Sequence, residues 1–154
     1  MSTAGGGAAQ QADDALAEIL NESHTIAVVG IKDRPGEDAY RIPRYMQDHG
    51  YRIVPVNPKL NAVLGEDAYA SLTDVDAAGI EIDLVNLFRA SDHVAAHVEE
   101  IVALAIRPQA VWMQLGIHHG PSAARLREAG IRVVQDRCIM VDHRRLVAGE
   151  TGSS

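Results

Sequence analysis

The stretch TIAVVGIKDRPGEDAY, residues 25–40, determines the fold class of this chain. Residues 26–29 form a short unbroken apolar run, which is typical of a strand buried on both faces. The run ends at Gly30, a polar loop follows, and a helical pattern opens near Asp38. Strand, glycine turn and helix form the first half of a βαβ unit. The turn places backbone N–H groups at a helix N-terminus, a position that favours an anion and most often a phosphate.

The remainder of the chain repeats this alternation of strand and helix. Apolar runs predict four further strands, at residues 51–56, 82–88, 110–113 and 131–134, and helical patterns follow most of them. The alternation predicts a single α/β domain with a Rossmann-like, doubly wound parallel sheet of about five strands. The domain is expected to span residues 13–147, between a disordered, glycine-rich tail at 1–12 and a frayed tail at 148–154.

Two helix boundaries depend on single residues. Asp13 or Asp14 is expected to cap a short helix that runs through Leu20. Pro43 predicts that regular helix after the first strand begins only around Ile42, because proline is tolerated in the first turn of a helix but not in its interior.

Composition excludes several classes of protein. The 154 residues have a formal net charge of −7, which argues against general nucleic-acid binding because that needs a basic face. No apolar run approaches the roughly 20 residues of a membrane span, and the N-terminus lacks the pattern of a signal peptide. Cys138 is the only cysteine, so no internal disulfide can form and a cytoplasmic location is expected.

Four loops are expected to meet at one edge of the sheet. Right-handed crossovers place every strand-to-helix loop at the carboxyl ends of the strands, where ligands of such folds bind. These loops are residues 30–36, 56–60, 88–92 and 114–120. The chain has only two lysines, Lys32 and Lys59, and both fall in these loops. The ligand site is therefore predicted at this edge.

The loop sequences favour one kind of nucleotide. A nicotinamide dinucleotide site would need Gly-x-Gly-x-x-Gly after the first strand and an acidic residue near the end of the second. Here no glycine follows Gly30 until Gly36, and the second strand runs into Val56-Asn57-Pro58-Lys59. A lysine at that position suits a ligand with an extra phosphate on its ribose. Coenzyme A (CoA), with its 3′-phosphate, fits, and NADP fits less well for want of the glycines.

Several segments together show a family resemblance: AVVGIKDRPGEDAY, GYRIVPVNPK, DLVNLFRASDHV, VWMQLGI and VVQDRCIMVDHRRL. They resemble the small bacterial CoA-binding proteins, which are similar to the N-terminal CoA-binding domain of the succinyl-CoA synthetase α subunit. The resemblance covers residues 20–147. Where the family usually has a small residue and a serine after the glycine, this chain has Ile31 and Lys32, which replace a hydroxyl donor with a cation.

The resemblance implies contacts with CoA from all four loops. The loop after the first strand would hold the pyrophosphate, and the loop after the second would line the adenosine end, with Lys59 near the ribose phosphate. The third and fourth strands would border the cofactor. The candidate binding residues are Gly30, Ile31, Lys32, Asp33, Arg34, Val56, Asn57, Pro58, Lys59, Phe88, Arg89, Gln114, Leu115 and Gly116. The cations among them suit a ligand with about four negative charges.

Some of these residues have a simple interpretation that needs no ligand. Lys59 is expected either at a phosphate or in solvent, and Arg89 either at the ligand or in an ion pair with Asp92. Phe88 is more typical of a core side chain, and Gln114 is equally suited to satisfying backbone groups at a strand end.

No metal site is predicted from the histidines. His93 and His97 stand four residues apart on one helix, a spacing that suits metal binding, but no third ligand is evident and both are expected to be exposed to solvent. His118 and His119 are interpreted as loop residues that could contact the ligand, not as catalytic or phosphorylated histidines.

No catalytic residue is predicted either. Cys138, followed by Asp142 and His143, resembles a Cys-His constellation, but a buried structural cysteine is the better interpretation. A nucleophile, a base and an oxyanion site cannot be assembled from the sequence.

The sequence therefore predicts a non-catalytic module that binds CoA or an acyl-CoA as a carrier, sensor or partner subunit. One alternative is a CoA-ligase-like subunit whose other domains lie on separate chains, and another is an NADP-binding protein. The expected ligand is CoA or an acyl-CoA, and association with a second copy of the chain or with an acyl-CoA-metabolising protein is a further possibility. Neither nucleic acid nor membrane is expected as a partner.

Overall fold

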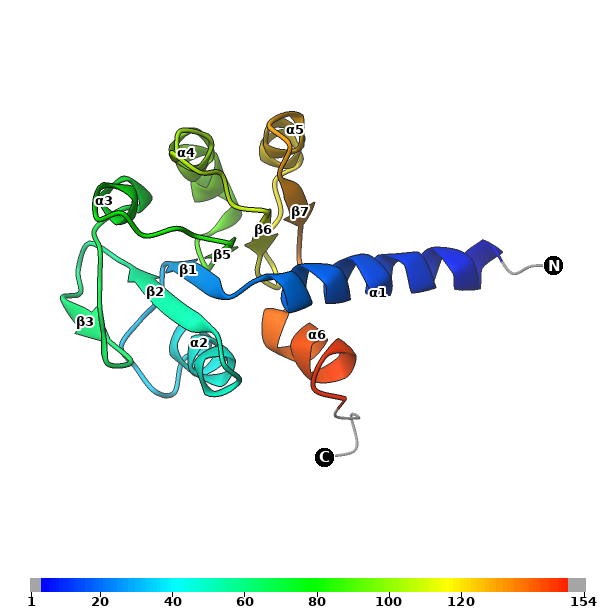
Figure 1. Cartoon of the computed structure of the whole chain (residues 1–154), viewed down its shortest axis with the longest axis horizontal. Coiled ribbons are helices and arrows are strands. Elements are labelled where there is room, and N and C mark those ends of the chain that lie inside the picture. Colours follow the sequence, from blue (N-terminus) through cyan, green and yellow to red (C-terminus); the bar gives the residue numbers. More distant parts are fainter. Residues whose placement is uncertain (1–3, 150–154) are drawn as a thin grey trace.

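A parallel sheet of five strands lies at the centre of the protein, and the computed structural model describes residues 4–149 around it (Figure 1). The sheet order is β2-β1-β5-β6-β7. The predicted Rossmann-like α/β fold is confirmed, and the predicted strand ends differ from the observed ones by no more than two residues. The strands are β1 (Thr25–Val29), β2 (Arg52–Val56), β5 (Leu84–Leu87), β6 (Ala110–Met113) and β7 (Arg132–Val134).

Within residues 4–149, three helices cover each face of the sheet (Figure 1). Helices α1 (Ala4–Glu22), α2 (Asp38–Asp48) and α6 (Ile139–Leu146) pack on one face, and α3 (Leu72–Ala77), α4 (Ser91–Val102) and α5 (Gly120–Glu128) pack on the other. Alternate strand residues enter the two layers: Ile26 and Val28 of β1 face one core, and Ala27 and Val29 face the other. This double burial explains the unbroken apolar runs of the sequence.

A small antiparallel hairpin follows β2. Its strands are β3 (Ala62–Val63) and β4 (Glu66–Asp67), joined by Leu64 and Gly65, which both have positive φ angles. The hairpin is attached to the main sheet through Tyr69, whose backbone N–H donates to the carbonyl of Pro55 at 2.9 Å.

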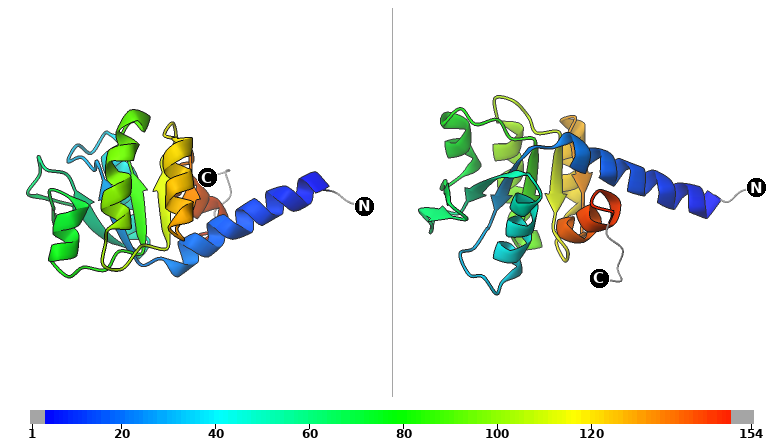
Figure 2. Two further views of the ribbon diagram at one scale, coloured as in Figure 1. Left: turned by 90° about the horizontal axis from the view of Figure 1, so that it is seen from above. Right: turned by 60° about the horizontal axis from the view of Figure 1, so that its bottom comes forward.

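Helix α1 is longer than predicted. It begins at Ala4 rather than near Asp13, so the part of the expected disordered tail that the structure describes is helical. Residues 1–3 and 150–154 of the two predicted tails lie outside the described residues. Burial of the C-terminal part of α1 provides a stable helical nucleus, and the alanines and glutamines before it extend the helix because their propensity is high. The N-terminal part projects from the body of the protein (Figure 2).

Helix α2 begins at Asp38, earlier than the start predicted from Pro43, which lies inside it. A proline has no N–H, so it cannot donate to the carbonyl four residues before it. That carbonyl belongs to Ala39, and it accepts instead from the backbone N–H of Lys32 at 3.1 Å. The proline is accommodated because the preceding loop supplies the missing donor. This hydrogen bond joins the loop after β1 to α2.

Candidate functional site

The turn after β1 is held by close contact between three strand ends. Gly30 has a φ of +89°, and its N–H donates to the carbonyl of Val56 at 3.0 Å. A Cβ atom at this position would lie 3.1 Å from the carbonyl oxygen of Phe88, the residue after β5. Only glycine meets both conditions without strain. Its predicted place in a tight turn is therefore correct, although its own N–H is used within the protein.

The rest of this loop presents charged side chains at the N-terminus of α2. Glu37 is the N-cap residue, and its carboxylate makes no side-chain cap bond. It lies instead 3.3 Å from Nζ of Lys32 and 3.6 Å from Nε of Arg34. Backbone N–H groups at a helix N-terminus, together with two cations, favour an anion, and the anion present there is the protein's own Glu37. Glu37 was not among the predicted site residues.

Ile31 was predicted to contact the ligand, and its side chain does not line the cleft described below. The side chain is fully buried in the core that α2 covers, so any contact with a ligand would have to come from its backbone. A branched apolar residue after the glycine anchors the start of the loop, where the family resemblance led us to expect a small residue and a contact.

Asn57 joins the two loops that follow β1 and β2. Its Nδ2 donates to the carbonyl of Ile31 at 2.8 Å, and its Oδ1 accepts from the backbone N–H of Lys59 at 2.8 Å. Its backbone N–H donates to the carbonyl of Tyr69 at 2.9 Å. The amide therefore fixes the spacing of the loops, and Lys59 is left exposed with no ion-pair partner anywhere in residues 4–149.

These two loops enclose a cleft of about 350 Å³. Three cations and one acid line it, so the local charge is opposite to the overall charge of −7. The volume is within the range of small-molecule sites. The lining residues are Lys32, Asp33, Arg34, Asn57, Lys59 and Leu60. All but Leu60 were predicted, and Leu60 gave no signal because a leucine after a polar loop is ordinarily a core residue.

The predicted residues after β5 and β6 do not line this cleft. Phe88 is half-buried and packs against the core, as its simpler interpretation proposed. Arg89 is exposed, and the ion pair considered between it and Asp92 is not formed; Asp92 instead lies near His93. The Cδ of Arg89 lies 3.1 Å from the point where a Cβ on Gly30 would be, so this side chain passes over the glycine turn.

Gln114 has a structural role at the end of β6. It is buried, and its Oε1 accepts from Nδ2 of Asn86 and from the backbone N–H of Ile139, both at 3.3 Å. It thus links two strand ends to the start of α6. The next residue, Leu115, is 67% exposed, and Gly116 donates its N–H to the carboxylate of Asp136 at 2.6 Å. Of the predicted residues still to be placed, Val56 is buried and Pro58 is exposed.

The histidines of the strand-end loops have structural partners or face solvent. His119 is the N-cap of α5, where its Nδ1 accepts from the backbone N–H of Ser122 at 3.2 Å. His118 is exposed. On α4, burial lowers the pKa of His97, and the nearby Glu100 partly offsets that effect. Within residues 4–149 no three side chains of metal-ligating type are grouped as a metal ion would need.

The residues of the Cys-His constellation lie at the start of α6, where Asp142 and His143 have partners on other residues. Cys138 occupies the N-cap position of α6 and is half-buried rather than buried. The carboxylate of Asp142 is held by Arg137 at 2.6 and 2.9 Å, and Nδ1 of His143 lies 2.9 Å from the hydroxyl of Tyr45. Asp142 is therefore bonded to Arg137, and Nδ1 of His143 to Tyr45.

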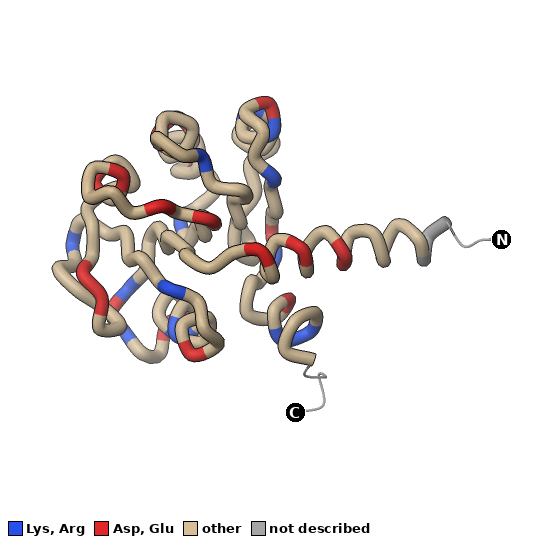
Figure 3. The backbone as a smooth tube through the Cα atoms, viewed as in Figure 1, with Lys and Arg blue, Asp and Glu red and all other residues tan. Residues whose placement is uncertain are grey.

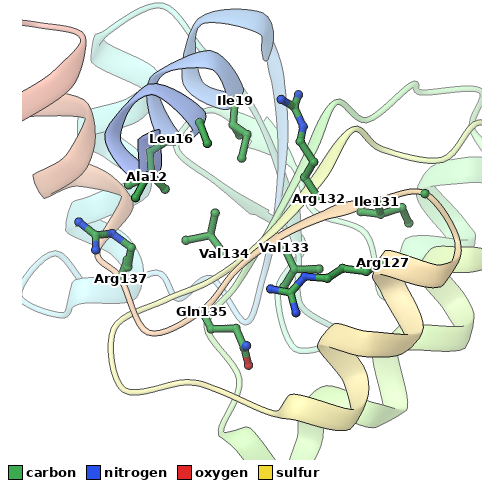
Figure 4. A pocket seen from close by; sticks show the side chains of 12 residues that line it. Ala12, Leu16, Ile19, Arg127, Ile131, Arg132, Val133, Val134, Gln135 and Arg137 are labelled. Atoms are coloured by element: carbon green, nitrogen blue, oxygen red, sulfur yellow. The ribbon is translucent and has the colours of Figure 1, made fainter. Parts of the chain in front are cut away.

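A larger cavity of about 660 Å³ lies away from these loops, between α1 and β7 (Figure 4). None of the predicted site residues lines it. Its wall is mostly apolar, and two of its three arginines, Arg132 and Arg137, are held by carboxylates of the same chain. The smaller cleft is lined mainly by polar and charged side chains, and its Lys59 has no such partner among the described residues. Phosphate recognition needs such groups, so the smaller cleft is the better candidate for a nucleotide. In the described chain, none of the helices is of a length and apolarity that would let it span a bilayer.

Comparison with known proteins identifies the family of this chain. Residues 24–144 match the sequence profile of the CoA binding domain family. The uncharacterised protein YneT of Bacillus subtilis (strain 168) is 39% identical over 128 residues, which are 83% of this chain and 91% of YneT.

Solved structures show the same fold. A Thermus thermophilus protein is 40% identical with a TM-score of 0.78, and the match covers 87% of this chain and 98% of that one. A hypothetical protein from Pyrococcus horikoshii OT3 is 33% identical with a TM-score of 0.81, over 88% and 92% of the two chains. The WlbA dehydrogenase of Bordetella pertussis, at 18% identity and a TM-score of 0.53, shares the fold alone. Sequence, fold and relatives together establish that this chain belongs to the CoA binding domain family.

Proposed function

We propose that this protein binds CoA, free or acylated, in the cleft between the loops after β1 and β2, in the cytoplasm and without a catalytic activity of its own. The observation that supports this most directly is the set of three cations, from two loops, around a cleft of about 350 Å³ in an otherwise acidic protein. The family match covers both loops.

Each part of the cleft suits one part of the ligand. The N-terminus of α2, with Lys32 and Arg34, suits the pyrophosphate, because helix N-termini and cations both stabilise negative charge. The loop after β2 is the place where nucleotide-binding folds of this kind contact the ribose. The exposed, unpaired Lys59 there suits a ribose 3′-phosphate, which CoA has. A carboxylate for an unmodified ribose diol is absent from the cleft wall after β2, since Asn57 occupies that position.

Binding requires that the loop cations exchange partners. Glu37 pairs with Lys32 and Arg34, and both pairs are largely exposed, so each contributes little stability. A pyrophosphate has more negative charge than one carboxylate and would replace Glu37 at modest cost. Asn57 keeps the two loops at a fixed distance throughout, which lowers the entropic cost of ordering them around the ligand.

Calorimetric titration with CoA, 3′-dephospho-CoA and NADP tests the proposal. We expect a CoA dissociation constant in the micromolar range, about −8 kcal/mol. Dephospho-CoA should bind about twofold to fivefold more weakly, because it loses one exposed charge pair. In Lys59→Ala, CoA and dephospho-CoA should bind equally. Arg52→Ala is the matched control, because Arg52 is exposed at the opposite end of β2 and its loss changes the net charge by the same amount.

The outcomes separate the parts of the proposal. Absence of CoA binding would refute the function. Equal binding of CoA and dephospho-CoA to the unmodified protein would remove Lys59 from the site. Tighter binding of NADP than of CoA would favour the nicotinamide alternative, and a large protein that co-purifies stoichiometrically would favour the ligase-like subunit.

A further inference from the structure

Both lysines of the chain line the candidate cleft, Lys32 in the loop after β1 and Lys59 in the loop after β2. All the other cationic side chains are arginines, and these are spread over α2, β2, α5, β7 and α6 as well as the loops (Figure 3). Lysine differs from arginine in that its amine, once it has lost its proton, is a nucleophile that can be acylated. Lysine amines open to acylation therefore occur only in this cleft.

The two lysines differ in their surroundings. Nζ of Lys32 lies 3.3 Å from the carboxylate of Glu37, which also lies 3.6 Å from Nε of Arg34. Lys59 is exposed and forms no ion pair within residues 4–149. Its backbone is nevertheless anchored, because its N–H donates to Oδ1 of Asn57 at 2.8 Å. Lys59 thus offers an unpaired amine from one loop of the cleft, while two paired cations lie in the other loop.

The charge of the cleft favours an acyl donor that is itself an anion. Three cations and the acidic Asp33 line about 350 Å³ of space, and a surplus of positive charge raises the local concentration of phosphates. In an acyl phosphate the reactive carbonyl is bonded directly to the phosphate, so a phosphate held by Lys32 and Arg34 brings that carbonyl into the cleft that Lys59 lines. In an acyl-CoA the thioester lies at the far end of the pantetheine arm from the phosphates. The cleft therefore suits an acyl phosphate as the donor.

We propose that Lys59 is a modification site that acyl phosphates acylate, with their phosphate held by Lys32 and Arg34, and that the modification weakens the binding of CoA. The Nζ amine attacks the acyl carbon, and an amide bond forms. The bond from that carbon to the phosphate oxygen breaks, and inorganic phosphate leaves with the electron pair and takes up the proton that the nitrogen loses. The effect on CoA rests on the proposed function, because an amide has no charge to pair with a ribose 3′-phosphate.

Acetylation of the full chain by acetyl phosphate, followed by peptide mapping in a mass spectrometer, tests the site. We expect Lys59 to be acetylated about twofold to fivefold faster than Lys32, whose amine is paired with Glu37. Inorganic pyrophosphate should slow the reaction at Lys59, because it competes for the same cations. Arg34→Ala should slow it about twofold to fivefold, because it removes part of the phosphate site. Arg52→Ala, exposed at the opposite end of β2, is the matched control and should leave the rate unchanged.

A neutral acyl donor separates a phosphate site from simple exposure. N-hydroxysuccinimidyl acetate has no phosphate, so neither Arg34→Ala nor pyrophosphate should change the rate at which it acetylates Lys59. If Arg34→Ala also left the rate with acetyl phosphate unchanged, Lys59 would be an exposed amine without a phosphate site, and the proposal would be overturned. Acetylation of Lys32 as fast as that of Lys59 would overturn it as well.

The effect on CoA is measured separately, by calorimetry. Protein acetylated at Lys59 should bind CoA about twofold to fivefold more weakly and 3′-dephospho-CoA as before. Lys59→Gln, with an uncharged amide, should behave in the same way, and Lys59→Arg should keep its CoA affinity and gain no acetyl group at this position. Acetylated protein that binds CoA as tightly as before would overturn the effect on CoA. Absence of CoA binding before treatment would refute the proposed function and with it this effect, while the acetylation rates still decide the modification site.

Discussion

Substitution of Asn57 by alanine should lower the stability of the protein before any ligand is added. The change removes the bond from Nδ2 to the carbonyl of Ile31 and the bond from the Lys59 N–H to Oδ1, both 2.8 Å long. Each neutral hydrogen bond contributes about 1 kcal/mol net, so the loss predicts a decrease of about 2 kcal/mol in the free energy of unfolding. For a chain of this length that corresponds to a melting temperature lower by roughly 4–8 °C.

The same change should weaken CoA binding by about threefold to tenfold, because the two loops of the cleft would have to be ordered by the ligand. Urea unfolding followed by circular dichroism measures the first effect, and calorimetry measures the second. Asn61→Ala is the matched control, since Asn61 is exposed in the same segment and only its backbone carbonyl is bonded, to the N–H of Ala68. Lys59→Ala gives the opposite pattern, with affinity lost and stability kept.

An intermediate variant separates the two bonds. Asn57→Asp keeps the acceptor for the Lys59 N–H but loses the donor to Ile31, and it adds a negative charge to the cleft. Its free energy of unfolding should decrease by about 1 kcal/mol, half of the decrease expected for Asn57→Ala. Its affinity for CoA should decrease more than that of Asn57→Ala, because the added negative charge repels the phosphates. If Asn57→Ala proved as stable as Asn61→Ala while losing affinity, Asn57 would contact the ligand rather than join the loops.

Three further changes test other parts of the structure. Glu37→Gln should tighten CoA binding about threefold at low salt, because Lys32 and Arg34 lose their competing carboxylate. Calorimetry measures the change, and weaker binding would mean that Glu37 orients those cations for the ligand. Gly30→Ala should cost about 2–4 kcal/mol in urea unfolding, from its φ of +89° and the backbone 3.1 Å from the new Cβ, and a loss below about 1 kcal/mol would contradict the close approach. Burial raises the pKa of Tyr51 to about 12, so the folded state binds this proton more tightly than the unfolded state. Stability should therefore fall as the pH rises from 10 to 12, and absorbance titration should show a tyrosine that ionises near pH 12, a signal that Tyr51→Phe removes.

Part of the candidate site followed directly from the sequence. A glycine at the end of an apolar run and lysines in two successive loops are local signals, and parallel topology brings the ends of neighbouring strands together. For this reason Lys32, Arg34 and Lys59 were correctly predicted to share one region, and the structure places all three around one cleft. The sequence also identified Gly30, because an abrupt end of a buried strand at a glycine predicts a tight turn.

Other residues of the predicted site have partners that only the fold reveals. Gln114 and Ile31 lie in loops by sequence, yet Gln114 bonds to the start of α6 and Ile31 is buried beneath α2. Asn57 is polar and next to a lysine, which suggests a ligand contact, but its amide is used by a loop 26 residues away in the chain. Side-chain hydrogen bonds of this kind depend on long-range packing, which residue type and spacing do not encode.

The fold shows the same contrast between what the sequence predicts and what depends on long-range packing. The sequence by itself determined the α/β class, the five strands and the edge at which they end, because burial on two faces imposes an unbroken apolar pattern on each strand. The length of α1 and the groove beside β7 were decided by tertiary structure. Packing of Leu16, Ile19 and Leu20 against the sheet stabilises a helix that its glycine-rich start does not predict, and the groove exists only because that helix crosses a free strand edge.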